Sequence, residues 1–214
     1  MDKTQAAIEV FNRHAEDYQE RYMDQGMYAD ALTFFVRHLP GPKPLVLDVA
    51  CGPGNITRYI CGQRPDIQAV GIDLAEKMLE LARLNNPNSR FEALDARDID
   101  QLGLSFHGII LGFILPYLSR EETALLIQKC AKNLLPEGVL YLSTMEGAYE
   151  KSAYTLPSTG IGPAVYMHYY EGPDLLNMLT EQGFQVMLED RKQYQNGKGE
   201  PVTDLILVAR KLSI

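Results

Sequence analysis

Short apolar runs alternate with amphipathic helical segments along most of this chain, and this alternation constrains the fold more than any other feature. The runs predict strands over 45–49, 68–72, 90–94, 108–113 and 139–143. The first, Leu45-Val46-Leu47, is continuously apolar, as is typical of strands buried on both faces of a parallel sheet. Strands that alternate with helices imply right-handed crossovers, so we expect a doubly wound α/β fold.

The carboxyl end breaks the alternation. Two further strands are predicted over 184–188 and 202–208, and the segment between them contains Asn196-Gly197 and has no room for a crossover helix. A hairpin therefore joins them, and the apolar run 205–208 indicates that the second strand lies inside the sheet. We expect a seven-stranded, mostly parallel sheet with a reversed last strand and helices on both faces.

Two segments stand outside this core. Apolar stripes over 4–22 and 28–39 predict two N-terminal helices, the second ending at Pro40-Gly41-Pro42. The segment 147–173 reads as a long loop rich in tyrosine, and such loops are usually functional. We expect it to be a lid over a substrate. Its tyrosines are Tyr149, Tyr154, Tyr166, Tyr169 and Tyr170.

Charge and apolar patterning exclude several classes of protein. The chain has 20 Lys and Arg against 28 Asp and Glu, a formal charge of −8, with no dense basic run, which disfavours a nucleic-acid partner. The longest apolar runs are about ten residues, well short of the roughly 20 that span a bilayer. The polar start lacks the pattern of a secretion signal, so a cytoplasmic protein is expected. The three cysteines match no zinc or disulfide spacing, so no metal site is expected.

The turn after the first strand carries the first chemical signal. Gly52-Pro53-Gly54 falls between a strand and a helix, in the crevice where open sheets bind ligands. A dinucleotide fingerprint would have Gly or Ala at position 57, where this chain has Thr57, and Pro53 lacks the N–H that would help cradle a pyrophosphate. Asp48, at the end of the strand, would repel a pyrophosphate and favour a cation.

A second carboxylate narrows the ligand. Asp73 lies 19 residues after Gly54, at the tip of the second predicted strand, where a carboxylate can accept hydrogen bonds from both hydroxyls of a ribose. The ligand should therefore combine a ribose with positive charge. S-adenosylmethionine has a sulfonium, an ammonium and a ribose with both hydroxyls.

Residues 48–54 resemble motif I of the class I S-adenosylmethionine-dependent methyltransferases. Further segments resemble the family's later motifs, in order: 71–78, 94–98, 111–113 with 115–118 behind it, and 134–138, where Glu-Gly replaces the usual Gly-Gly. The resemblance covers roughly residues 10 to 212. It implies an enzyme with a Rossmann-like fold and S-adenosyl-L-methionine as cofactor.

The resemblance also implies a cofactor site. By this resemblance, Asp73 is expected to bind the ribose, and Leu74 and Met78 to lie near the adenine. The Asp95 side chain and the backbone N–H that follows it are expected to contact the adenine edge. Tyr18 resembles a tyrosine that related enzymes bring over the cofactor, although plain core packing explains it equally well. Arg97 and Asp98 are expected at the solvated surface. The expected cofactor-binding residues are Tyr18, Asp48, Ala50, Cys51, Gly52, Gly54, Asp73, Leu74, Met78, Asp95, Ala96, Leu111, Gly112 and Phe113.

The substrate side is less defined. His168, beside Tyr169 and Tyr170, is the best candidate for a general base or substrate ligand, against the alternative of a histidine that only packs in a loop. These three are the candidate catalytic residues. No Asn-Pro-Pro-Tyr-like tetrad follows the fourth strand, which argues against the branch that methylates amino groups of nucleic acids.

We therefore expect one methyltransferase domain over 1–214. Residues 1–40 form a helical cap, 45–146 the cofactor-binding core, 147–173 the lid, and 174–214 the last helix and hairpin. The expected function is methyl transfer from S-adenosylmethionine to a small-molecule acceptor by in-line displacement. The alternatives are a cofactor-binding regulatory module without transfer and an NAD-binding oxidoreductase. The acceptor and the oligomeric state stay open.

Overall fold

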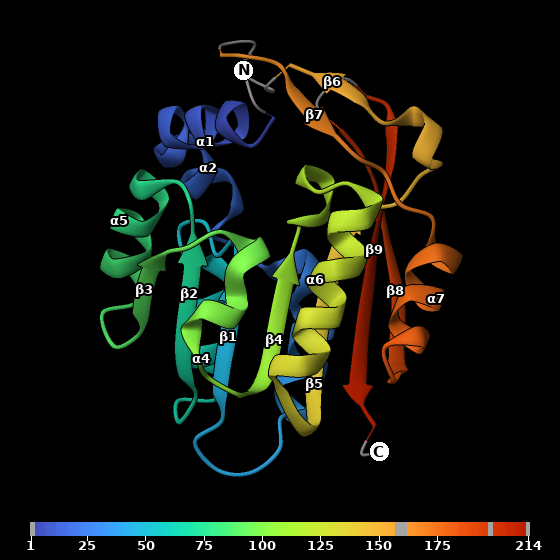
Figure 1. Ribbon diagram of the computed structural model, residues 1–214. Helices are drawn as coiled ribbons and strands as arrows, with labels where there is room; N and C mark the ends of the chain where they lie inside the picture. Colours follow the sequence, from blue (N-terminus) through green and yellow to red (C-terminus); the bar gives the residue numbers. More distant parts are fainter. Residues whose placement is uncertain (1–2, 157–161, 197–198, 213–214) are drawn as a thin grey trace.

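A seven-stranded sheet forms the centre of the computed structural model, which describes residues 3–156, 162–196 and 199–212 (Figure 1). Its strand order is β3-β2-β1-β4-β5-β9-β8, and every pair is parallel except those that involve β9. The strands are β1 (Leu45–Val49), β2 (Gln68–Asp73), β3 (Arg90–Ala93), β4 (Phe106–Gly112), β5 (Leu134–Met145), β8 (Phe184–Gln195) and β9 (Pro201–Lys211).

Helices cover both faces of the sheet because the central strands are apolar on both sides. Leu47 belongs to the core cluster under α6 and α7, and its neighbour Val46 belongs to the cluster under α3 and α4. None of the helices in the described part of the chain is long and apolar enough to cross a membrane. The helices are α1 (Lys3–Arg13), α2 (Ala15–Tyr22), α3 (Ala29–His38), α4 (Asn55–Gln63), α5 (Glu76–Asn85), α6 (Arg120–Asn133) and α7 (Gly172–Glu181).

The reversed strand β9 lies inside the sheet, between β5 and β8, as its apolar sequence predicts. Residues 204–209 of β9 are all buried, because both neighbouring strands and the helices of both faces surround them. β5, β8 and β9 are longer than their apolar runs, since backbone pairing continues into polar residues. In the turn of the hairpin, the Asn196 side chain accepts the N–H of Glu200; Gly197 lies outside the described residues.

The N-terminal stripe over 4–22 forms two helices, and the expectation of one continuous helix is wrong. The chain breaks at His14, whose φ of −113° and ψ of 23° are not helical. α1 contacts both α5 and the lid strand β7 (Val165–Met167), while α2 contacts α5. The break lets the two helices bend across the carboxyl ends of the parallel strands (Figure 1).

The lid segment is more structured than a loop. It contains a short helical turn, η4 (Tyr149–Lys151), and a two-stranded antiparallel sheet of β6 (Ala153–Thr155) and β7. The Tyr166 hydroxyl donates to the Ser152 carbonyl at 3.1 Å and so ties the two strands together. Residues 157–161 of this segment lie outside the described residues. The lid stands beside α1 above the sheet (Figure 1).

Two neighbouring leucines on α6 test how this helix is oriented. Leu126 is 1% exposed in the core and Leu125 is 57% exposed. We expect Leu126→Ala to lower the free energy of unfolding by about 2 to 5 kcal/mol, because it leaves a cavity in the core. Leu125→Ala should change it by less than about 0.5 kcal/mol. Urea unfolding of both variants measures this, and equal effects would contradict the packing described.

Candidate functional site

The turn between β1 and α4 has an unusual backbone. Ala50, Gly52 and Gly54 all have positive φ, at 54°, 52° and 74°. Such values are rare for a residue with a side chain, so Ala50 is held in a strained conformation. At Gly54 the reason for glycine is packing, because a Cβ there would lie 2.3 Å from the Asn86 amide nitrogen on the neighbouring segment.

Asp73 connects this turn to the end of β2. Its carboxylate accepts the N–H of Gly52 at 2.9 Å and the N–H of Ala75 at 2.8 Å. Burial raises the pKa of Asp73, although these backbone hydrogen bonds and one from Leu74 oppose the rise. The side chain is held at a fixed position on the crevice wall, with lone pairs left for a ligand.

Asp48 lies under the same turn. It is 1% exposed, and its Oδ2 accepts the hydroxyl hydrogen of Thr57 at 2.7 Å. Burial raises the pKa of Asp48 to about 7; hydrogen bonds from Thr57 oppose the rise and the nearby Asp73 adds to it. Thr57, which replaces the third glycine of a dinucleotide fingerprint, therefore serves as the partner of this buried acid.

A cavity of about 890 Å³, including its open mouth, lies above the turn, between the carboxyl ends of the strands and the N-terminal helices. The expected cofactor residues on its wall are Tyr18, Ala50, Gly52, Asp73, Leu74, Met78, Asp95, Ala96, Gly112 and Phe113. The expected residues that are not on its wall are Asp48, Cys51, Gly54 and Leu111.

The four residues off the wall lie beneath it or in the core. Asp48, Cys51 and Leu111 are each at most 3% exposed, and Gly54 is the N-cap of α4. A short linear motif cannot separate a residue that faces a ligand from a neighbour that supports it, because successive side chains of a strand point to opposite faces.

Half of the cavity wall comes from residues that are not among the expected cofactor-binding residues. They are Thr4, Ala7, Ile8, Phe11, Ala75, Leu94, Arg97, Ile114, Tyr117 and Leu118. Four of them belong to α1. The apolar stripe in its sequence predicts that one face of this helix is buried, but it does not predict that this face lines the cavity. The short helix η3 (Leu115–Tyr117) contributes Tyr117, whose ring packs edge-on against Phe11 at 5.3 Å.

Tyr18 covers the turn from α2. A Cβ added to Gly52 would lie 3.8 Å from the Tyr18 ring, and the rings of Phe11 and Tyr22 flank it at 5.8 and 4.5 Å. Burial raises the pKa of Tyr18, and the neighbouring Tyr117, Tyr22 and acidic residues raise it further, so the phenol stays neutral. Tyr18 therefore takes part both in core packing and in the cavity wall.

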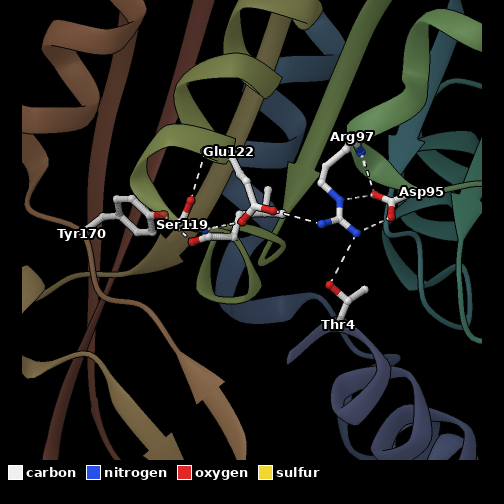
Figure 2. Close-up of polar contacts among 7 residues, drawn as sticks. Thr4, Asp95, Arg97, Ser119, Glu122 and Tyr170 are labelled. Atoms are coloured by element: carbon white, nitrogen blue, oxygen red, sulfur yellow. Dashed lines mark hydrogen bonds and ion pairs between the residues drawn. The ribbon is translucent and has the colours of Figure 1, made fainter. Parts of the chain in front are cut away.

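Arg97 is 39% exposed, so the expectation of a solvated residue holds in part, but its side chain also lies on the cavity wall. Figure 2 shows its guanidinium between Asp95 and Glu122, with Thr4 of the cap on a third side. It donates to Asp95 at 2.9 and 2.6 Å, to Glu122 at 3.0 Å and to Thr4 at 3.4 Å. Burial raises the pKa of Asp95, but the hydrogen bonds and charge of Arg97 outweigh it and keep that pKa below the usual value.

The three candidate catalytic residues lie in the lid and outside the cavity wall. The Tyr170 hydroxyl donates to the Leu118 carbonyl at 2.6 Å and contacts the Thr123 hydroxyl at 2.8 Å, which fixes the lid to α6 (Figure 2). The Tyr169 backbone N–H donates to the Ser152 hydroxyl oxygen at 3.2 Å. His168 is 6% exposed and stacks on Tyr149 at 5.6 Å.

His168 is the lid residue with unused hydrogen-bonding capacity. Its Nδ1 has no partner among the described residues. Burial and the charge of Lys3 lower its pKa, so the ring is neutral near pH 7. Its backbone N–H donates to the Pro116 carbonyl at 2.8 Å, which places the His168 main chain next to η3, whose Tyr117 is on the cavity wall.

Comparison with known proteins identifies the fold and the motifs together. A family model described as a methyltransferase domain matches residues 46–138. The chain is 27% identical over 188 residues to a dTDP-3-amino-3,6-dideoxy-α-D-glucopyranose N,N-dimethyltransferase of Streptomyces fradiae, covering 78% of this chain and 72% of the relative. It is 25% identical over 212 residues to a demethylmenaquinone methyltransferase of Thermotoga maritima, covering 86% and 90%.

Several other relatives match over only about half of their own length. Among solved structures, magnesium protoporphyrin IX methyltransferase from Synechocystis PCC 6803 has the same fold, with a TM-score of 0.71, 18% identity and coverage of 99% of this chain and 98% of that one. The reversed strand inside a parallel sheet and the glycine turn followed by Asp73 agree with these matches. The family model, the relatives and the solved structures together support a class I S-adenosylmethionine-dependent methyltransferase, an enzyme whose cofactor is S-adenosyl-L-methionine.

Proposed function

We propose that this protein transfers a methyl group from S-adenosylmethionine to a small-molecule acceptor by in-line displacement. The observation that carries the proposal is the position of Asp73 on the cavity wall, locked by the N–H groups of Gly52 and Ala75. A carboxylate held in this way can accept both ribose hydroxyls without reorganising. Further support comes from the aromatic cover over the same cavity.

The residues of the wall suit the parts of the cofactor. Leu74 and Met78 offer apolar contacts to an adenine, and Asp95 offers an acceptor at its edge, with the Asp95 rotamer fixed by Arg97. Asp48 supplies a buried negative charge under the turn, which favours a cationic group above it. When bound, the cofactor supplies a methyl carbon made electrophilic by its sulfonium.

The protein's part in the reaction is to align the acceptor and to exclude water. α1 contributes four residues to the cavity wall, and the Tyr18 ring lies next to Gly52 on the same wall. If the acceptor carries a proton, His168 is the proposed base, because it is neutral near pH 7 and its Nδ1 is unused. Tyr169 and Tyr170 would then position the lid that carries it.

A small molecule is the acceptor class best supported. The relatives described above are named for a nucleotide-linked amino sugar, demethylmenaquinone and magnesium protoporphyrin IX. These compounds differ in their acceptor atoms, so their names support the size of the acceptor and not its chemistry. The charge of −8 disfavours a nucleic-acid acceptor.

Calorimetric titration tests the cofactor assignment. S-adenosylhomocysteine and S-adenosylmethionine should each bind at one site per chain, and NAD should not bind at the same concentrations. The physical reason is that the Gly52-Pro53-Gly54 turn, with Asp48 beneath it, disfavours a pyrophosphate. Binding of NAD with no response to the other two ligands would overturn the proposal.

Asp73→Ala tests the ribose contact. We expect S-adenosylhomocysteine to bind about 5- to 150-fold more weakly, since the variant leaves ribose hydroxyls without a buried partner. Asp66→Ala is the matched control, because Asp66 also accepts a backbone N–H, from Lys43 at 2.8 Å, but is exposed and off the cavity wall. Circular dichroism checks the fold of both. Unchanged affinity in folded Asp73→Ala would contradict the assigned contact.

Asp48→Asn tests the buried charge through pH. The pKa of Asp48 is about 7 in the folded protein, above its unfolded value, so its contribution to stability is complete below pH 4 and is lost as the pH rises toward 8. The amide cannot ionise. We therefore expect the stability of Asp48→Asn relative to wild type to increase by about 2 to 4 kcal/mol between pH 4 and pH 8.

Urea unfolding of both proteins at pH 4 and pH 8 measures this difference. The other ionisable groups are the same in the variant and the wild type, so most of their effects on stability cancel in the comparison. Asp66→Asn should change in the opposite direction, since hydrogen bonds from Lys43 and Arg64 lower the pKa of Asp66. A relative stability of Asp48→Asn that does not depend on pH would show that Asp48 is not perturbed as described.

A further inference from the structure

Asp204 is a fully buried acid that the cofactor site does not use. It lies on β9 directly opposite Met145, at the carboxyl end of β5. The parallel strands of the sheet, including β4 with Phe113 after it, end at this same edge. Asp204 therefore stands near the Phe113 side of the cavity, away from the adenine-facing residues Asp95 and Ala96.

Half of the Asp204 carboxylate is unused. Oδ2 accepts the hydroxyl hydrogen of Tyr28 at 2.7 Å, whereas Oδ1 has no hydrogen-bond partner among the described residues. The Tyr194 hydroxyl is close enough to help lower the pKa of Asp204, although burial dominates and raises it. Buried acceptors without a partner are rare in folded proteins, and each one needs a reason.

The basic residues opposite Asp204 and next to it in the β8–β9 strand register are paired elsewhere. Lys192 stands opposite Asp204 in the strand register, but its ammonium pairs with Asp190 at 2.8 Å. Arg191 pairs with Glu146 and Glu189, both at 2.7 Å. No ion pair to Asp204 occurs in the part of the chain that the structure describes, so the acid lacks a counter-charge within the protein.

Tyr28 joins Asp204 to the cavity. Its ring packs edge-on against Phe113 at 5.4 Å, and Phe113 is on the cavity wall. The Phe113 N–H donates to the Ser143 carbonyl at 3.0 Å, and the buried Ser143 hydroxyl also lacks a partner among the described residues. Two unused polar atoms, on Ser143 and Asp204, thus lie beside the wall next to Phe113.

Tyrosines surround this place. Tyr194 has a raised pKa, first because of burial, then because of Asp204, and further because of the nearby Tyr22 and Tyr169. Tyr22 in turn packs against Tyr18 of the cavity wall at 4.5 Å. Electron-rich ring faces together with a carboxylate are the usual surroundings of a bound ammonium group.

We propose that Asp204, with Tyr28 and Tyr194 beside it, forms the acceptor subsite and selects small molecules that carry a cationic nitrogen. The proposal rests on the proposed methyl transfer and adds its substrate class. An anionic acceptor would bind at the lid instead, because two cationic side chains lie there. The Lys3 Nζ is 3.6 Å from the centre of the Tyr166 ring, and the Arg120 Cζ is 5.7 Å from the centre of the Tyr149 ring.

Three probes that share a phenol ring and differ in charge test this subsite: tyramine, the neutral tyrosol and 4-hydroxyphenylacetate. Each is titrated into protein saturated with S-adenosylhomocysteine, which cannot donate a methyl group. We expect tyramine to bind at least about tenfold more tightly than tyrosol, the effect of one hydrogen bond to a charged group. The carboxylate probe should bind most weakly.

Asp204→Asn should remove the preference for tyramine while leaving the affinity for S-adenosylhomocysteine unchanged. Tyr28→Phe keeps the Asp204 carboxylate and removes the hydrogen bond to its Oδ2, so this variant should retain the preference for tyramine. Glu189→Gln is the control, because Glu189 is on the neighbouring strand but pairs with Arg191. Thermal melting with bound S-adenosylhomocysteine confirms that each variant is folded.

Three results would overturn the subsite: a tyramine preference that survives in Asp204→Asn, equal or tighter binding of either other probe to wild type, or no tyramine binding to the loaded protein. Failure of the wild type to bind S-adenosylhomocysteine counts instead against the proposed function, so the two failures are distinguishable.

Discussion

The hydrogen bonds of the Asp73 carboxylate organise the candidate site. They join the end of β2 to the turn after β1, two places that are 21 residues apart in the chain and adjacent in the sheet. The contact with Gly52 holds the turn in its positive-φ conformation, and the contact with Ala75 starts α5 beside it. Without this carboxylate, the cavity floor would lose both its shape and its charge. One side chain therefore couples the local fold to the ligand it is expected to bind.

The three acidic residues at the site, Asp48, Asp73 and Asp95, have different electrostatic surroundings. Asp48 and Asp73 are buried near the turn and have raised pKa values, because burial disfavours their charged forms. Asp95 differs, since Arg97 neutralises it and keeps its pKa low. The cavity is thus more acidic at the turn than at the adenine end. A cationic ligand group at the turn would relieve a destabilising charge, so cofactor binding and stability are coupled there.

Arg97 links three parts of the chain that are distant in sequence. It contacts Thr4 in the cap, Asp95 after β3 and Glu122 in the first turn of α6 (Figure 2). Glu122 also closes a capping box with Ser119, and the next residue, Thr123, contacts Tyr170 of the lid. Cap, core and lid therefore meet in one polar network beside the cavity. This network explains why Arg97, a charged residue that the sequence predicts in solvent, lies on the cavity wall.

Sequence patterns alone determined the alternation of strands and helices, the reversed final strand and the places of Asp73 and Gly52, because period and turn chemistry are local properties. They did not separate Asp48, which supports the turn, from Ala50, which faces the cavity. They also did not locate the break at His14, the role of Arg97 or the unpaired Asp204. Those features depend on contacts between residues such as Thr4 and Arg97, or Tyr28 and Asp204, that are 93 and 176 positions apart. Only the folded chain brings such groups together, since burial and pairing are properties of the tertiary structure.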